Sequence, residues 1–568
     1  MFWRSVRQSR GRVYFAATFG TGEALVCLEH SRLSEGDPPK FLTKATRHVA
    51  VPDGDNAIIA YVSPLTSENL LLLAEQEQLG ILPQNLKTTP RLGLGVRMLF
   101  SLPPLLEAVE KADFRADFQL SGGREFSLRE VIKALPGRYP EWLGHTGLYA
   151  DLLYGTIVKE CFKFGRSTYG TEIDHLIVST DPSSVIARIR GHAEPNIPTT
   201  DIDRTMLDKS VEYCQRVIEE ATRTGLVVGM TTDVSALSKE PVDDSVAWST
   251  GHILSEYERI LSPEERDALL AWYHPGTPHV IADHSGMDGF ELTFSDEELA
   301  RLAVKYRDGL LVNKRLYEHM KSGMRGRSFN FELSLDEAYK TLTTEKELFF
   351  YLSESARMGM RADLVAPNVG FRKREDHSGD LGELESRIHR LAVVAWHFGA
   401  ILDFHSGSDK RPEVYQAISR ACNGKLKLKM SAIFQLLFFE TLASFRPGTE
   451  ERKTFERVWD YTLCYTRKKA AEGDSSAQCM IKEFDTRTHP RRCGSRSPRD
   501  EFFRHYSFIT VAARNRTGRY LFRHSLYRLA EKPRVAKKYN RRVIMVTCRV
   551  ARALGLAQTA RPARLRSS

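Results

Sequence analysis

The clearest pattern in the sequence is FNFELSLDEAYKTLTTEKELFFYLSESARMGMRADLVAPNVG, residues 329–370. A short apolar run opens this stretch, an amphipathic segment follows at 343–360, and a second short apolar run closes it at 362–370. The two outer runs have the length of strands, whereas the middle segment has the length and apolar spacing of a helix. A strand, a helix and another strand in this order are typical of parallel strands joined by a crossover helix.

The same alternation recurs over a large part of the chain. The short apolar runs are EIDHLIVST (172–180), GLVVGMTTD (225–233), HVIADHSG (279–286), FNFELSLDE (329–337), ADLVAPNVG (362–370), AILDFHSGS (400–408) and KLKLKMS (425–431). Between them lie helical patterns such as GELESRIHRLAVVAWHFGA at 382–400. Seven such units, with an eighth strand expected before residue 170 or after 500, predict a closed (β/α)₈ barrel. A doubly wound open sheet is the alternative, because periodicity does not decide closure.

Composition divides the chain into three regions. Residues 1–85 hold β-like runs separated by turn residues and form a predicted N-terminal β-containing region, and 86–485 form the predicted α/β-barrel catalytic domain. Residues 486–568 carry 22 Lys and Arg against three acids, a balance of +19, which leaves about −9 for the rest of a chain whose net charge is +10. Spaced apolar residues predict that this basic segment is partly packed, with disorder at its end.

Several classes of protein are disfavoured by what the sequence lacks. It has no continuous apolar stretch near the roughly 20 residues of a membrane span, and it begins without a secretory signal. The eight cysteines include no C-x-x-C pair, which favours reduced thiols and a cytoplasmic setting. The basic segment contains no recognisable nucleic-acid-binding module, so we expect a small-molecule partner and no membrane. Nucleic-acid binding through the basic segment is the less favoured alternative.

Polar side chains stand near the carboxyl ends of the predicted strands. They are Asp174, His175, Glu332, Ser334, Asp336, Asp403 and His405. Residues two apart on a strand share a face, and the carboxyl end of the strands is the active face of a barrel. Each of these residues taken alone is better explained by a helix cap or a local ion pair. As a set, imidazole and carboxylate groups predict a site for a divalent cation: Zn²⁺, Mn²⁺, Ni²⁺, Co²⁺ or Fe²⁺.

The loop Asp-Phe-His-Ser-Gly-Ser-Asp-Lys, residues 403–410, is the strongest candidate for a carbohydrate contact. It follows a predicted strand, and its hydroxyl and backbone N–H groups suit a hydroxylated or anionic ligand. Lys410 could hold a carboxylate or phosphate as a point charge. The sequence contains no P-loop, dinucleotide-binding, nucleophile-elbow or zincin motif, so those functions have no support.

Several segments, taken in order, resemble the tagaturonate epimerase family. They are RLGLG (91–95), FQLSGGRE (118–125), YGTEIDH (169–175), FELSLDE, TTEKE, LVAPNVGF, GDL and FHSGSDK. The resemblance covers roughly residues 85–480. The chain departs from the family pattern at Ala338, at Leu348 and at Arg411–Gln416.

The resemblance implies a metal-dependent enzyme that interconverts tagaturonate and fructuronate, or related neutral ketoses. The inverted carbon lies one bond beyond the carbon next to the ketone, so metal-assisted retro-aldol chemistry is the expected mechanism. The implied site has His175, Glu332 and His405 as metal ligands, Asp174 with Asp336 or Glu337 as acid–base groups, and Gln119, Arg124, Ser406 and Lys410 orienting the sugar or its carboxylate. Another metal-dependent barrel sugar isomerase or aldolase, and a non-catalytic carbohydrate-binding relative, are the alternatives.

Overall fold

The computed structural model of the protein describes most of its 568 residues. The described ranges are 1–20, 22–32, 38–53, 55–178, 203–239, 250–281, 289–336, 342–371, 375–487 and 496–557.

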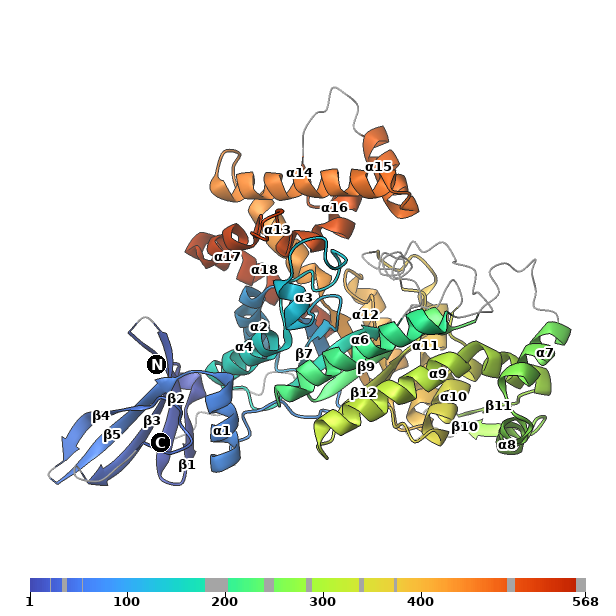
Figure 1. Ribbon diagram of the computed structural model, residues 1–568, viewed down its shortest axis with the longest axis horizontal. Coiled ribbons are helices and arrows are strands. Elements are labelled where there is room, and N and C mark those ends of the chain that lie inside the picture. The colour runs from blue at the N-terminus through green and yellow to red at the C-terminus, as the bar shows by residue number, and fades with distance from the viewer. Residues whose placement is uncertain are drawn as a thin grey trace.

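Eight parallel strands close into a barrel at the centre of the chain (Figure 1). In chain order they are β6 (Arg91–Gly95), β7 (Ala116–Ser121), β8 (Gly170–Ile177), β9 (Gly229–Asp233), β12 (Asn330–Ser334), β13 (Leu364–Ala366), β14 (Ile401–Phe404) and β15 (Leu426–Met430). The first strand, β6, pairs with the last, β15, in parallel register, which closes the sheet. The predicted (β/α)₈ barrel is therefore confirmed, and the alternative of an open sheet is wrong.

The prediction located six of these strands and misplaced one. The run that begins at His279 does not join the barrel: β10 (His279–Ile281) pairs antiparallel with β11 (Phe290–Leu292) in a separate two-stranded sheet. Its central Val280 is 65% exposed, whereas barrel strands are buried on both faces. The two barrel strands that the prediction lacked are β6 and β7, both before residue 170.

Helices cover the outside of the barrel. They include α2 (Leu102–Ala112), α4 (Ala150–Lys163), α6 (Arg204–Arg223), α9 (Asp296–Met324), α10 (Glu345–Arg357), α11 (Leu381–His397), α12 (Pro412–Ala421) and α13 (Ala432–Ala443), with the short α3 (Arg129–Lys133) before α4. Helix α7 (Thr250–Ile260) packs on α9, and α8 (Pro263–Tyr273) contacts α10 through Tyr273. The two helices predicted at 343–360 and 382–400 are α10 and α11. A capping box between Thr344 and Glu347 begins α10, because each side chain accepts from the other residue's backbone N–H.

An antiparallel sheet forms the N-terminal region, as predicted, and lies at one end of the molecule (Figure 1). Its strands are β1 (Arg7–Ser9), β2 (Arg12–Phe19), β3 (Gly22–Arg32), β4 (Thr46–Asp53) and β5 (Asn56–Pro64), in the order β1-β2-β3-β5-β4. Helix α1 (Ser67–Glu77) follows the sheet, and its Leu70 and Leu73 join the same core as Tyr14 and Ile59.

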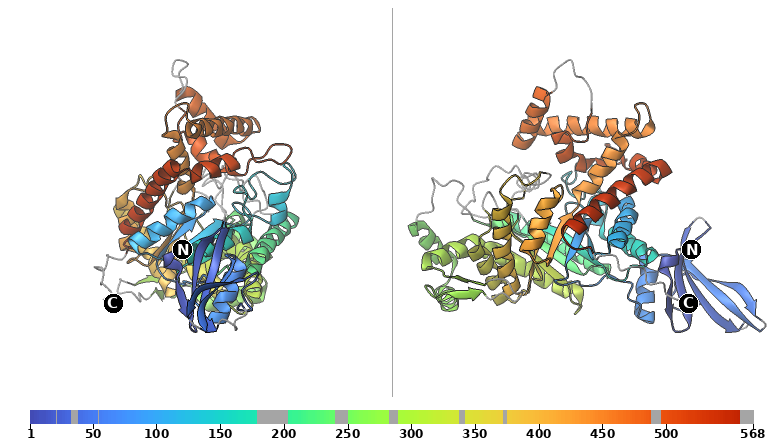
Figure 2. Two further views of the ribbon diagram at one scale, coloured as in Figure 1. Left: turned by 90° about the vertical axis from the view of Figure 1, so that its left-hand side faces the viewer. Right: turned by 180° about the vertical axis from the view of Figure 1, so that it is seen from behind.

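The C-terminal region is helical and gathers on one side of the barrel (Figure 2). Its elements are α14 (Glu450–Ala471), α15 (Ser475–Arg487), α16 (Glu501–Tyr506), the 3-10 helix η6 (Ser507–Val511), α17 (Arg523–Glu531) and α18 (Pro533–Ala553). Helix α18 packs on α2, α12 and α13, and Phe502, Phe503 and Tyr506 are buried. The predicted disorder at the end falls on residues outside the described ranges. No helix among the described residues combines the length and apolar character needed to cross a membrane.

Candidate active site

Polar residues fill the interior of the barrel. The buried residues that meet there are Arg91, Asp117, Gln119, Glu172, Asp174, Thr231, Asp233, Asn330, Glu332, Asp403, Lys427 and Lys429. Barrels of this type usually hold layers of branched aliphatic side chains in this space. Charged side chains are almost never fully buried without a partner, so the interior must be held together by ion pairs.

Lys427 of β15 occupies the deeper part of the interior, with none of its side chain exposed. Its Nζ donates to Glu172 and lies 3.1 Å from Glu332 Oε2 and 3.4 Å from Asp403 Oδ2. These carboxylates come from three other strands, β8, β12 and β14. Although burial lowers the pKa of the Lys427 ammonium, the surrounding carboxylates outweigh it and raise this pKa well above its ordinary value.

Lys429, two residues further along β15, forms a second layer. Its Nζ lies 2.6 Å from Asp174 Oδ1, 2.7 Å from Glu332 Oε1 and 3.2 Å from Thr231 Oγ1. Burial alone would raise the pKa of Asp174, but Lys429 lowers it below its ordinary value. Asp174 is therefore held as a carboxylate.

The interior holds more carboxylates than cations. Arg91, Lys427 and Lys429 face five acids: Asp117, Glu172, Asp174, Glu332 and Asp403. Two of the acids respond to this excess: burial and neighbouring carboxylates raise the pKa of Asp117 to about 7 and that of Asp403 to about 6. The excess of negative charge favours a further cation at this end of the barrel.

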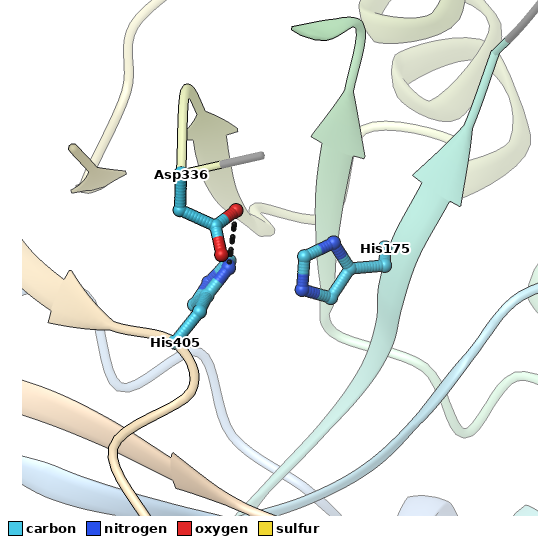
Figure 3. A group of neighbouring side chains, drawn as sticks. All are labelled: His175, Asp336 and His405. Carbon is cyan, nitrogen blue, oxygen red and sulfur yellow. Dashed lines mark ion pairs between the residues drawn. The ribbon is translucent and has the colours of Figure 1, made fainter. Parts of the chain in front are cut away.

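His175, Asp336 and His405 converge beyond the lysine layers (Figure 3). His405 Nδ1 lies 2.9 Å from Asp336 Oδ1, and the rings of His175 and His405 are 4.3 Å apart between centroids. One ligand atom from each of the three residues lies within 4.8 Å of the others, as a shared metal ion would require. His405 Nδ1 and His175 Nδ1 are both buried, and each lies beside a carboxylate oxygen, of Asp336 and of Asp233 respectively.

The backbone at His175 is strained. Its φ is +41°, in the left-handed region that residues other than glycine seldom adopt, and the pairing of β8 with β9 shifts register between Ile173 and Leu176. A break of register with a strained residue redirects side chains and is common next to functional sites. Asp233 Oδ2 lies 3.4 Å from His175 Nδ1, so this carboxylate can orient the ring and leave Nε2 for a ligand.

Glu332 lies beside His405 and deeper in the barrel. His405 Nε2 is 2.7 Å from Glu332 Oε1, and Glu332, His405 and Asp403 form a second group with metal-ligand spacing. Lys427 and Lys429 both donate to Glu332 and hold its pKa well below the ordinary value, although burial alone would raise it. The oxygens of Glu332 are therefore already occupied by ammonium groups.

The residues predicted to orient the sugar occupy different surroundings. Gln119 points into the barrel beside Gly93, where an added Cβ would lie only 2.8 Å from its Oε1. Ser406, with a φ of +54°, is partly buried on the loop after β14. Lys410 is buried, donates to the Glu375 carbonyl, and has its pKa lowered to about 8 by burial.

Arg124 lies on the loop after β7 and donates from Nη2 to Ser121 Oγ at 2.9 Å. Glu337 and Ala338 lie outside the described residues. The other departures from the family pattern are structural: Leu348 is fully buried in α10, and Arg411 is the N-cap residue of α12 and pairs with Asp376.

Sequence reasoning missed Lys427 and Lys429. The segment KLKLKMS was recognised as a strand, and its alternation was the available signal, since alternate lysines on a strand must share one face. In a closed barrel both faces of that strand are covered, so one set of its lysines has to enter the interior.

The fold and the site define a (β/α)₈-barrel enzyme. Among solved structures, the native fructuronate–tagaturonate epimerase of Cohnella laeviribosi is similar, with a TM-score of 0.63 and 19% sequence identity over 98% of this chain and 96% of that chain. A glycerol-complexed structure of the same enzyme gives a TM-score of 0.62 with the same identity and coverage. At this identity the likeness shows a shared fold. No curated protein matches the sequence.

The sequence itself identifies the family. The tagaturonate epimerase family model matches residues 218–543, more than half of the chain. The chain therefore belongs to the tagaturonate epimerase family and is a carbohydrate epimerase, an isomerase. The resemblance described from the motifs is thus confirmed.

The lysine layers give a first testable prediction. Lys429→Met leaves the buried Asp174 without its lysine and removes one of the two lysines beside Glu332 and Asp403. We therefore expect a loss of about 3–5 kcal/mol in the free energy of unfolding. Lys425→Met is the matched control, because Lys425 immediately precedes the same strand but is exposed, and it should change stability by less than about 0.5 kcal/mol. Denaturant unfolding of both variants measures the difference. Equal stability of the two would contradict the stabilising role of Lys429.

Proposed function

We propose that the protein epimerises a keto-sugar acid of the tagaturonate–fructuronate type, or a related ketose, with a divalent metal ion bound by His175, Asp336 and His405. The convergence of these three side chains at the end of the barrel carries the proposal. Zn²⁺, Mn²⁺, Ni²⁺, Co²⁺ and Fe²⁺ all accept a mixed set of imidazole and carboxylate ligands.

The positions of Lys427 and Lys429 favour the ligand set of His175, Asp336 and His405. The deeper set of Glu332, Asp403 and His405 is less suitable. A metal ion bound by Glu332 and Asp403 would lie beside two ammonium groups and would have to displace their hydrogen bonds. Nδ1 of His405, by contrast, faces Asp336, away from Glu332. In this arrangement Glu332 fixes the His405 ring through Nε2, as carboxylates behind metal-bound histidines do.

The position of the inverted carbon determines the chemistry. This carbon bears a hydroxyl group and is separated from the ketone by one carbon, so removal of a proton next to the ketone leaves it unchanged. In a retro-aldol reaction a base takes the hydroxyl proton, and the bond between the two carbons breaks to give an aldehyde and an enolate. The aldehyde rotates, the bond re-forms on its other face, and the proton returns. A bound metal ion supplies a Lewis acid for the ketone and enolate oxygens.

Asp174 is an acid–base candidate by its position. It immediately precedes His175, so a substrate hydroxyl near the proposed metal ligands would be within its reach. The sequence also offers Asp336 and Glu337 as acid–base groups, and since Asp336 is proposed here as a metal ligand, Glu337 is the other acid–base candidate. Gln119, Arg124, Ser406 and Lys410 remain candidates for orienting the sugar.

Product analysis tests this function. Metal-loaded protein should convert tagaturonate to fructuronate in D₂O without deuterium at the inverted carbon, because the C–H bond there never breaks in a retro-aldol reaction. Proton NMR measures both the product and the isotope. Formation of an aldose, or of free cleavage products, would instead favour the isomerase or aldolase alternative. Ligand binding without turnover under all five metal ions would favour a non-catalytic relative.

Metal content of variants tests the ligand set. His175→Ala, Asp336→Asn and His405→Ala should each lower bound metal by about tenfold or more after dialysis, because each removes one of three ligands. His389→Ala, a histidine of α11 outside the site, is the matched control. Elemental analysis of the purified proteins measures the change. Metal content in His405→Ala equal to that of the control would remove His405 from the ligand set.

Protonation of His405 predicts how metal binding depends on pH. Burial lowers the pKa of this histidine, but Asp336 outweighs burial and raises it to about 10, so its ring carries a proton at pH 7 in the metal-free protein. Metal binding must displace that proton, so affinity should rise from pH 7 to pH 10 with release of about one proton. The raised pKa also stabilises the metal-free fold below pH ~6.5, and this contribution is lost as the pH rises through about 10.

Calorimetry in buffers of different ionisation enthalpy measures the released proton. A metal affinity that stays constant from pH 7 to pH 10 would contradict a protonated His405 as a ligand.

A further inference from the structure

Two arginines lie close together at the mouth of the barrel. Arg97 follows β6, and its Nη2 lies 2.5 Å from Glu125 Oε1 while its Nε donates to Ser431 Oγ at 3.1 Å. Arg124 is linked to Arg97 through Ser121 and Glu125, since Arg124 donates to Ser121 Oγ and the Ser121 backbone N–H donates to the Glu125 carboxylate that Arg97 pairs with. Burial lowers the pKa of the Arg97 guanidinium, and the charge of Arg124 lowers it further. Arg97 is also within electrostatic range of Asp174, which places the pair next to the proposed catalytic groups.

Arg124 of this pair has buried donor atoms without hydrogen-bond partners. Glu125 is occupied by Arg97 and by the backbone N–H of Ser121, and Arg124 donates only from Nη2, to Ser121. The Nε and Nη1 atoms of Arg124 are buried without any hydrogen-bond partner. Unsatisfied buried donors on a charged group are costly, and a bound anion would satisfy them.

Residues of the C-terminal region lie beside Arg97 and against His145, whose backbone N–H donates to the Arg124 carbonyl. Phe508 of η6 packs the edge of its ring against His145, 4.7 Å between centroids. Arg97 and Arg124 both act on His145: together with burial, they lower its pKa well below the ordinary value, so it stays neutral and adds no positive charge. The C-terminal region therefore meets the barrel here through an aromatic contact between Phe508 and the neutral ring of His145.

A small hollow opens between the C-terminal region and the barrel. Its lining includes Arg97, Asp409, Gln435, Arg504 and Phe508. Gln435 donates from Nε2 to the Ser507 carbonyl at 3.0 Å, which leaves its Oε1 buried without a partner. The hollow lies at the start of α13, after the last barrel strand, where barrel enzymes frequently bind anionic groups. Asp409 connects it to the metal-site loop, four residues after His405.

We propose that residues 501–511 form a wall of the substrate site, and that this wall encloses Arg97 and Arg124 as a subsite for the anionic end group of the substrate. The two guanidinium groups would donate to a carboxylate or a phosphate, and Gln435 Oε1 would accept from a neighbouring hydroxyl group. The identity of the substrate in this inference rests on the proposed function. The negative charge of its end group rests on the geometry alone.

Equilibrium binding tests the subsite separately from turnover. Calorimetric titrations of the metal-loaded protein with tagaturonate, tagatose 6-phosphate and tagatose compare a carboxylate, a phosphate and a neutral end. We expect at least one anion to bind more tightly than tagatose, and the tighter of the two identifies the end group. Equal affinity for all three ligands would overturn the subsite, whether or not the protein catalyses epimerisation.

Substitution of the arginine tests its assignment. Arg124→Gln should weaken binding of the preferred anion by about 10- to 100-fold and change tagatose binding by less than about threefold. Arg129→Gln, an exposed arginine nearby that pairs with Asp151, should leave both affinities unchanged. Equal losses for the anion and for tagatose in Arg124→Gln would contradict a role specific to the charged end.

Separate variants test whether residues 501–511 belong to the substrate site. Phe508→Leu keeps the apolar volume but removes the ring edge from His145, and Arg504→Gln removes a cation from the hollow. Both should raise KM for the anionic substrate several-fold with little change in kcat and in Tm, whereas the exposed control Arg528→Gln should change none of these. If turnover is absent, the same comparison uses Kd. Unchanged KM or Kd in both variants would remove residues 501–511 from the substrate site.

Discussion

Ion pairs between two buried lysines and the carboxylates around them hold the interior of this barrel together. Lys427 and Lys429 extend from one strand and reach acids on β8, β12 and β14, so each lysine ties together strands far apart in the sequence. Buried charges are tolerated only with such close and complete pairing. The usual aliphatic interior is thereby replaced by a charged one whose members are held by this pairing.

The same layers determine where function can lie. Because the lysines occupy the oxygens of Glu332 and face Asp403, the deeper acids support His405 from behind. The side chains left to converge on a ligand are His175, Asp336 and His405, one step nearer the mouth. Beyond them lie the two arginines, with residues of the C-terminal region beside Arg97 and against His145. From the inside outward, the barrel presents structural ion pairs, a proposed metal site and a proposed anion subsite.

The barrel and the clustering of its polar residues could be predicted from the sequence. The order of the strands could not, for physical reasons. Strand–helix alternation predicted the barrel, and period-two spacing brought Asp336 and His405 to the same end, since both rules are local. The strand order, and with it the meeting of Lys429 with Asp174, depends on contacts 255 residues apart, which periodicity does not encode. The run at 279 was misassigned because a short apolar segment has the same pattern in a surface hairpin and in a barrel. No sequence pattern indicated that Arg97 belongs to a binding site, because its partners Arg124 and Glu125 lie on another loop.

Anomalous diffraction from crystals of the metal-loaded protein tests the central claim most directly. The account predicts one strong peak about 2.0–2.2 Å from a nitrogen of His175, a nitrogen of His405 and an oxygen of Asp336, with Lys429 still paired to Glu332. A peak between Glu332 and Asp403, with Lys429 displaced, would contradict it.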